Sequence, residues 1–146
     1  MDTVTLTIDG QQITVAKGKT VLQAAIEAGI SVPYYCFHPG LVVDGSCRVC
    51  IVKIEKMAKL QTSCSTTCTD GMVVSTRDPE TTAARAGVLE FLLVNHPLDC
   101  PVCDKGGECP LQDFSYTFGP TRAGWNSRGA NSTATASGPT SISVRR

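Results

Sequence analysis

Residues 96–109 read HPLDCPVCDKGGEC, and we interpret most of the remaining chain as a scaffold that presents this loop. The loop brings together one imidazole and three thiols, from His96, Cys100, Cys103 and Cys109. Zinc takes histidine and cysteine ligands, and so do iron–sulfur clusters. The four side chains therefore predict a metal site, and their chemistry alone leaves both kinds of metal open.

A helix is expected to lead into this loop. The residues DPE at 78–80 combine an N-cap, a proline at the first helical position and an acidic first turn. A helical period continues to Asn95, and His96-Pro97 ends it, because the residue before a proline avoids the helical conformation. The expected apolar face consists of Ala84, Val88, Phe91 and Leu92.

The N-terminal half predicts a small mixed sheet packed on one helix. Hydrophobic residues alternate with polar ones over 3–8 and 13–15, on either side of Asp9-Gly10, which is typical of a β-hairpin. Thr20 can cap a helix that Gly29 closes. The predicted fold class is α+β, with further strands expected over 49–54, 60–64 and 72–75.

A separate set of four cysteines precedes the second helix, in the pattern C-x10-C-x2-C-x13-C. One interpretation is a structural zinc site, although zinc ribbons usually pair two C-x2-C knuckles and this pattern has one. The other is a binuclear iron–sulfur cluster with two cysteines on each iron. That cluster suits the small residues Gly45 and Ser46, because the backbone must approach the sulfides. The set consists of Cys36, Cys47, Cys50 and Cys64.

Charge and composition narrow the class of protein. The chain has 146 residues, with 13 Lys and Arg against 13 Asp and Glu. This balance argues against nucleic acid as the partner, because phosphate binding needs a basic surface. It begins without a secretory signal, and its most apolar segment, residues 87–94, is too short to span a bilayer. We therefore expect a cytoplasmic protein, in which metal ligation explains the eight cysteines better than disulfides do.

Four segments around the first cysteine set carry a resemblance to a known family. They read PYYCFHP at 33–39, GSCRVC at 45–50, TSCST at 62–66 and DGM at 70–72. Together, residues 3–76 resemble the β-grasp [2Fe-2S] ferredoxin domain at the start of the large iron–sulfur subunit of respiratory complex I, the bacterial NADH-quinone oxidoreductase. The resemblance implies that a [2Fe-2S] cluster is held by Cys36, Cys47, Cys50 and Cys64.

Two other cysteine-loop residues are interpreted without a ligand role. Cys68 follows the last ligand of the first set, and we expect it to be a buried free thiol. His38 lies close to Cys36 in the sequence, and we expect it to be a surface or packing residue.

The later loop supports the same resemblance. The segments NHPLDCPVCD at 95–104 and GGECPLQD at 106–113 closely match the family's motif with one histidine and three cysteines. The resemblance implies a [4Fe-4S] cluster here, and a neutral imidazole in place of a thiolate should raise its reduction potential. The implied ligands are His96, Cys100, Cys103 and Cys109.

The implied function is electron transfer. No nucleophile–base pair, paired carboxylates or Gly-x-Gly-x-x-Gly loop stands out, which agrees with chemistry that is carried by cofactors. By resemblance, the chain relays electrons from NADH, through a flavin on a partner subunit, toward quinone. The implied partners are other subunits of the complex I peripheral arm, and membrane association would be indirect, at the cytoplasmic face of the inner membrane.

Two alternatives stay open. The same modules occur in the diaphorase-side iron–sulfur subunit of an NAD-linked hydrogenase or formate dehydrogenase. A zinc-binding interaction module without redox activity is an alternative of another class, because zinc accepts the same ligands.

We divide the chain into a [2Fe-2S] domain over 1–78, an incomplete [4Fe-4S] domain over 79–120 and a disordered tail over 121–146. The residues of the tail are small and polar, and the resemblance ends before it.

A frameshift would explain where the resemblance ends. If the codons for 123–146 are read one base earlier, a permitted translation is SRMEFPRRQFDRDGVRAHFDFGPT, which resembles the sequence that the family carries after this loop. We therefore hypothesise a frameshift near 120–122, and resequencing that finds the given frame intact, with no downstream cysteine motifs, would refute it. The first cluster is expected to assemble more reliably, because residues that pack behind the second would be missing.

Overall fold

The computed structural model describes residues 2–120, so the expected tail and frameshift at 121–146 lie outside the described part. The chain begins with a hairpin of β1 (Thr3–Ile8) and β2 (Gln11–Ala16), which pair antiparallel from Thr3 with Ala16 to Ile8 with Gln11. Asp9 and Gly10 form the turn at φ 49° and 84°. Positive φ at both central residues matches the twist of the flanking strands, so the predicted Asp-Gly hairpin is confirmed.

Five strands form one mixed sheet in the order β2-β1-β5-β3-β4. The later strands are β3 (Ile51–Ile54), β4 (Gln61–Thr62) and β5 (Val73–Ser75), and each lies within a range that the sequence predicts. β5 runs parallel to β1 and antiparallel to β3. The side chains of Leu6, Ile8, Val52 and Val74 form the centre of the core.

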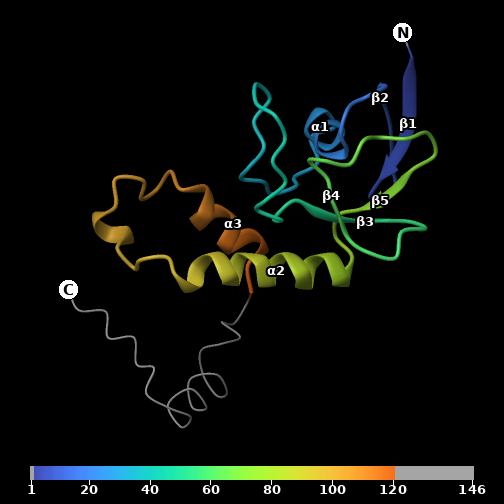
Figure 1. Ribbon diagram of the computed structural model, residues 1–146. Coiled ribbons are helices and arrows are strands. Elements are labelled where there is room, and N and C mark those ends of the chain that lie inside the picture. Colours follow the sequence, from blue (N-terminus) through green and yellow to red (C-terminus); the bar gives the residue numbers. More distant parts are fainter. Residues whose placement is uncertain (1, 121–146) are drawn as a thin grey trace.

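The first helix, α1 (Val21–Glu27), packs its buried residues into this core (Figure 1). Thr20 caps it as predicted: its hydroxyl accepts from the Gln23 amide, and the Gln23 side chain accepts from the Thr20 amide. Gly29, at φ 70°, follows the C-cap, where a left-handed residue ends many helices. The predicted α+β arrangement, a small mixed sheet packed on one helix, is confirmed.

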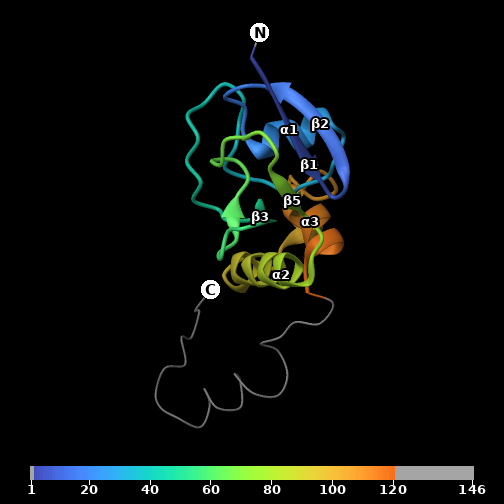
Figure 2. The ribbon, with the colours of Figure 1, turned by 90° about the vertical axis from the view of Figure 1, so that its right-hand side faces the viewer.

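The long helix α2 (Pro79–Val94) crosses below the sheet, contacts β3, and has α3 (Pro110–Phe118) beside it (Figures 1 and 2). Asp78 caps α2 by accepting from the amides of Glu80 and Thr81, at 2.8 and 3.2 Å, so the predicted start is confirmed. A 3-10 turn, η1 (Cys100–Val102), lies in the loop between α2 and α3. Among residues 2–120, no helix is long and apolar enough to cross a membrane.

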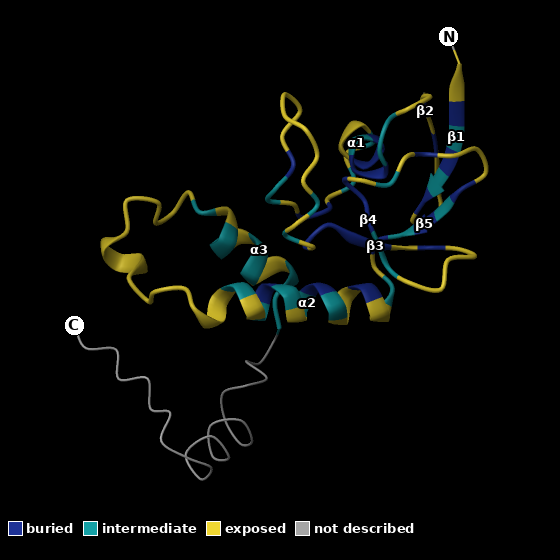
Figure 3. Ribbon diagram, in the orientation of Figure 1, coloured by how far each residue is buried: buried dark blue, intermediate teal, exposed yellow. Residues whose placement is uncertain are grey.

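The apolar face predicted for α2 is wrong. The buried residues are Thr81, Arg85 and Leu89, whereas Phe91 is 73% exposed. Figure 3 shows that the exposed stretches of α2 lie on its side away from the sheet. Apolar residues occur on every side of this helix, so their spacing does not single out one face. The side that faces the sheet instead carries a buried arginine, whose guanidinium donates hydrogen bonds to backbone carbonyls in and next to β3 and β5.

Candidate metal centres

The four cysteines of the first set come from one long loop and from two strand ends. Cys36 and Cys47 lie half-buried in the loop between α1 and β3, Cys50 directly precedes β3, and Cys64 follows β4. Cys50 and Cys64 are each only 1% exposed and belong to the hydrophobic core. The sheet therefore fixes one pair of thiols, and the loop brings the other pair to it.

The loop is shaped to stabilise negative charge on Cys36. Gly45 and Arg48 adopt left-handed conformations, at φ 71° and 60°, which turn successive amides toward one point. Burial alone would raise the pKa of the Cys36 thiol. Hydrogen bonds from Cys47 and from the amides of Gly45 and Ser46 outweigh that effect and lower this pKa. The geometry thus favours a thiolate, which is the ligand form of cysteine.

Cys64 shows how closely the four thiols interact. Burial raises the pKa of Cys64 to about 12, and its hydrogen bond with Cys50 and the negative charges of Cys50, Cys36 and Cys47 act in the same direction. All four thiols can become thiolates together only if a cationic centre neutralises them, and a metal that binds thiolates does so. Cysteine thiolates that accept hydrogen bonds from backbone N–H groups are typical of the ligands of an iron–sulfur cluster.

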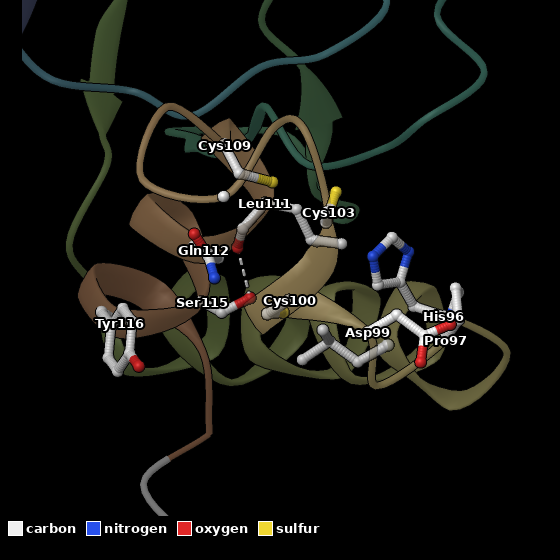
Figure 4. Close-up of a pocket in the computed structure, with 12 residues that line it drawn as sticks. His96, Pro97, Asp99, Cys100, Cys103, Cys109, Leu111, Gln112, Ser115 and Tyr116 are labelled. Carbon is white, nitrogen blue, oxygen red and sulfur yellow. Dashed lines mark hydrogen bonds between the residues drawn. The ribbon is translucent and has the colours of Figure 1, made fainter.

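The second set surrounds one cavity of about 290 Å³, which also includes residues of α3 (Figure 4). His96 follows the end of α2, Cys100 begins η1, Cys103 caps that turn, and Cys109 caps α3. The sequence separates these residues by up to 13 positions, and the structure places all four on one cavity wall. A single water needs only ~10–15 Å³, so the cavity has room for a much larger group.

Gly106 lines this cavity at a position that leaves no room for a side chain. A Cβ atom there would lie 2.9 Å from the carbonyl oxygen of Cys100 and 3.1 Å from that of Cys103. The Gly106 amide donates to the Cys103 carbonyl at 2.9 Å, so the turn is closed by backbone contacts. Gly107 follows at φ 87° and donates to the Gln112 side chain of α3. Two glycines thus wrap the backbone around the cavity, as a bulky cluster requires.

The two sets differ in their surroundings. His96, Cys100 and Cys103 are exposed and Cys109 is half-buried, in a loop that projects beyond the sheet (Figure 3). Within residues 2–120, no group of three or more His, Cys, Asp or Glu side chains is gathered closely enough to hold one metal ion in common. A polynuclear cluster distributes its ligands over several irons, so its ligands need not converge on one point.

Tyr35 lies between the two sites. Its hydroxyl donates to the Pro110 carbonyl at 3.3 Å, and its ring lies 5.2 Å from that of Phe114, between centroids. Burial raises the pKa of Tyr35 to about 12, and the negative charges of Cys109 and Cys47 add to this effect. The charge of one predicted ligand from each set therefore acts on the same side chain.

The two residues interpreted without a ligand role also have clear positions. Cys68 is 3% exposed, and burial raises the pKa of its thiol, as expected for a free thiol in a core. His38 is exposed and accepts a hydrogen bond from the Gly40 amide at 3.1 Å. The sequence interpretation missed the contacts of Tyr35 and Arg85. Tyr35 stands next to Cys36 in the chain, but neither its position nor that of Arg85 within a helix shows what the side chain contacts.

Comparisons with known proteins agree with this arrangement. Residues 1–79 match the family described as 2Fe-2S iron-sulfur cluster binding domain. Residues 85–123 match the NADH-ubiquinone oxidoreductase-G iron-sulfur binding region. The two matches cover the two cysteine sets separately.

Several curated proteins are similar over most of the chain. The G subunit of the NADH-quinone oxidoreductase of Streptomyces coelicolor is 56% identical over 120 residues, which cover 81% of this chain and 14% of that protein. The mitochondrial NADH-ubiquinone oxidoreductase 78 kDa subunit of Neurospora crassa is 50% identical, over 82% of this chain and 16% of its own length. The chain thus spans about one seventh to one sixth of the length of these relatives.

A solved structure has the same fold. A chain of NAD+-reducing [NiFe]-hydrogenase in the H2-reduced state superposes with a TM-score of 0.75 and is 36% identical. The match covers 83% of this chain and 51% of the hydrogenase chain.

Proposed function

Because the chain belongs to the family of 2Fe-2S iron–sulfur cluster binding domains and is similar to part of the G subunit of NADH-quinone oxidoreductases, we propose that it is an electron-transfer subunit of such a complex. Its residues hold two clusters, and bound clusters supply one-electron transfer. Two observations support the proposal: the four cysteines of the first set interact with one another, and the four predicted ligands of the second set line one cavity.

Each ligand group has its own task. Cys36, Cys47, Cys50 and Cys64 hold a [2Fe-2S] cluster against the sheet, and the amides of 45–47 stabilise its sulfur charge. The second group holds a [4Fe-4S] cluster in the cavity between α2 and α3. These ligands are His96, Cys100, Cys103 and Cys109.

The relatives' names contain NADH and quinone as the two ends of the electron route. The family resemblance adds the proposed path: electrons enter from NADH through a flavin on a partner subunit of the peripheral arm and continue toward quinone. The chain itself needs to bind neither NADH nor quinone, and it joins the cytoplasmic face of the membrane only through the complex. This assignment divides the chain after residues 78 and 120, and α2 begins directly after the first of these boundaries.

A second candidate is the diaphorase-side subunit of an NAD-linked hydrogenase, because a chain of NAD+-reducing hydrogenase shares the fold at TM-score 0.75. The 50–56% identity with the quinone oxidoreductase subunits exceeds the 36% identity with that chain and favours the first candidate. Neighbouring genes separate the two: membrane subunits support the quinone oxidoreductase, and hydrogenase genes support the alternative.

The proposal is tested by purifying the full chain without oxygen and measuring iron, acid-labile sulfide and zinc. We expect a brown protein that contains iron and sulfide in similar amounts and whose visible absorbance bleaches with dithionite. A colourless protein with stoichiometric zinc would overturn electron transfer and support the zinc-binding interaction module.

A further inference from the structure

Within residues 2–120, Arg85 is the only charged residue that is buried, and the proposed ligand sets do not explain it. It lies on the inward side of α2, between Thr81 and Leu89, and is 3% exposed. Removing a charge from water is expensive unless the protein supplies compensating groups. A buried arginine that serves no ligand role therefore calls for a reason.

The guanidinium holds the backbone on both sides of Cys50. Its Nε donates to the Val49 carbonyl at 3.3 Å, and its Nη2 donates to the Ile51 carbonyl at 2.8 Å. Its Nη1 donates to the Thr76 carbonyl at 3.3 Å, next to the end of β5. The fork geometry of arginine thus ties α2 to two strands and to the residues that flank a predicted ligand.

Aromatic packing covers this cation. The Cζ atom of Arg85 lies 5.2 Å from the centroid of the Phe118 ring at the end of α3. A cation over an aromatic face is attracted by the ring quadrupole, and the attraction is strongest where water is excluded. Phe118 therefore limits the solvent screening of the charge.

The positive charge lacks a carboxylate partner in the described part of the chain. Within residues 2–120, the ion pairs involve other side chains, and the partners of Arg85 are neutral carbonyls. Burial lowers the pKa of Arg85. The negative charge of Cys50 opposes this effect most strongly, followed by the charges of Asp9 and Asp78. An arginine stays protonated in proteins, so a cation without a directly bonded carboxylate lies beside the first site.

We propose that Arg85 is a positioning residue for the first site, which braces the backbone around Cys50 and supplies a fixed positive charge that makes a bound [2Fe-2S] cluster easier to reduce. The inference rests on the proposed function. Reduction adds one electron from the donor, and no bond forms or breaks. Arg85 stabilises the added negative charge, and because it is buried, salt screens it only weakly.

The test is a redox titration of the [2Fe-2S] centre in the full chain with both clusters loaded, followed by EPR with dithionite as reductant. Arg85→Met removes the charge, whereas Arg85→Lys keeps the charge but lacks the planar guanidinium that donates to three carbonyls. Arg77→Met is the matched control, because the Arg77 side chain is 80% exposed. The [4Fe-4S] centre of the same sample is an internal reference, since α2 continues ~14 Å beyond Arg85 toward it.

We expect Arg85→Met to shift the equilibrium between oxidised and reduced [2Fe-2S] centre at least tenfold toward the oxidised form. A tenfold shift equals about 59 mV for one electron. Arg85→Lys should keep most of the wild-type potential but unfold more readily, and Arg77→Met should leave the potential unchanged. A loaded Arg85→Met chain with the wild-type potential would overturn the inference while leaving the proposed function intact.

If Arg85→Met does not load a cluster, Phe118→Leu decides the matter, because it retains Arg85 and removes the aromatic ring that lies over the guanidinium. We expect a lower [2Fe-2S] potential that now varies with ionic strength. A potential equal to that of the wild type at low and at high salt contradicts the inference. A wild-type chain that binds no iron instead refutes the proposed function itself.

Discussion

At the scale of single residues, Gly106 tests the second site most sharply. Its missing Cβ leaves space against two carbonyl oxygens of the metal loop, at 2.9 and 3.1 Å. Contacts below 3.0 Å with backbone atoms force the backbone to move. We therefore expect Gly106→Ala to lose most of the [4Fe-4S] cluster and to keep the [2Fe-2S] cluster, as measured by iron and sulfide content with EPR.

Gly87→Ala is the matched control for this change. A Cβ at Gly87 meets no atom within 4 Å, and the residue lies in the interior of α2. Alanine there should stabilise the helix by about 1 kcal/mol and leave both clusters in place. Equal cluster content in the two alanine variants would contradict the assigned role of Gly106.

Cys68 tests the identity of the first ligand set. It is buried in the core beside α1, and its amide donates to the Lys19 carbonyl at 2.9 Å. We expect Cys68→Ala to retain the full [2Fe-2S] content and to lose roughly 1 kcal/mol of stability, as for a small deletion in a core. Cys64→Ala should abolish that cluster. The reverse outcome would make Cys68 the fourth ligand.

The candidate ligands stay a prediction, which rests on the cysteine spacing and on the resemblance to the family. Arg85 and Tyr35 could not be predicted, because their roles depend on contacts that fold-level packing creates. An arginine within a helix is usually solvated, and no local pattern shows that Arg85 meets the carbonyls of Val49 and Ile51.

At the scale of elements, the start of α2 depends on Asp78. Its carboxylate accepts from two backbone amides and from the Thr81 hydroxyl. We expect Asp78→Ala to lower the free energy of unfolding by about 1 kcal/mol, the usual value for a lost N-cap. Anaerobic urea unfolding measures it, and Asp44→Ala, which changes an exposed loop carboxylate, is the control.

The same cap has a defined pH dependence. Burial works against ionisation, but hydrogen bonds from Thr81 and from the Glu80 amide outweigh it and lower the pKa of Asp78. A carboxyl whose folded pKa is depressed stabilises the fold above its unfolded pKa, ~3.9, and loses that effect only as pH falls through the lower folded value. The Asp78→Ala difference should therefore be constant from about pH 6 to about pH 8, and a change within that range would be evidence against the cap.

The elements differ in how far the sequence could define them. The hairpin, α1 and the start of α2 have local signals, namely Asp9-Gly10, Thr20 and Asp78, and all three were predicted. The helix α3 was not predicted, because its first residues belong to the segment that matches the metal motif, which was interpreted as a loop. Pro110 at its start and the spacing of Phe114 and Phe118 were the available signals.

At the scale of the whole molecule, the two sites differ in protection. The first is built into the core, whereas the second lies in an exposed loop with uncovered apolar residues: Leu98 and Val102 are 94% and 81% exposed. A cluster needs a dry, hydrogen-bonded shell as well as its ligands. We expect the [2Fe-2S] cluster to load fully and to survive air longer than the [4Fe-4S] cluster. Equal, air-stable occupancy of both would contradict this expectation.

The most direct measurement is the EPR spectrum of the dithionite-reduced chain, recorded for the wild type, Cys50→Ala and Cys103→Ala. The account predicts two signals in the wild type, because each set of four residues holds its own cluster. Cys50→Ala should lose only the [2Fe-2S] signal, and Cys103→Ala only the [4Fe-4S] signal. A wild-type chain without either signal, or variants that lose both signals together, would contradict the central claim of two separate redox centres.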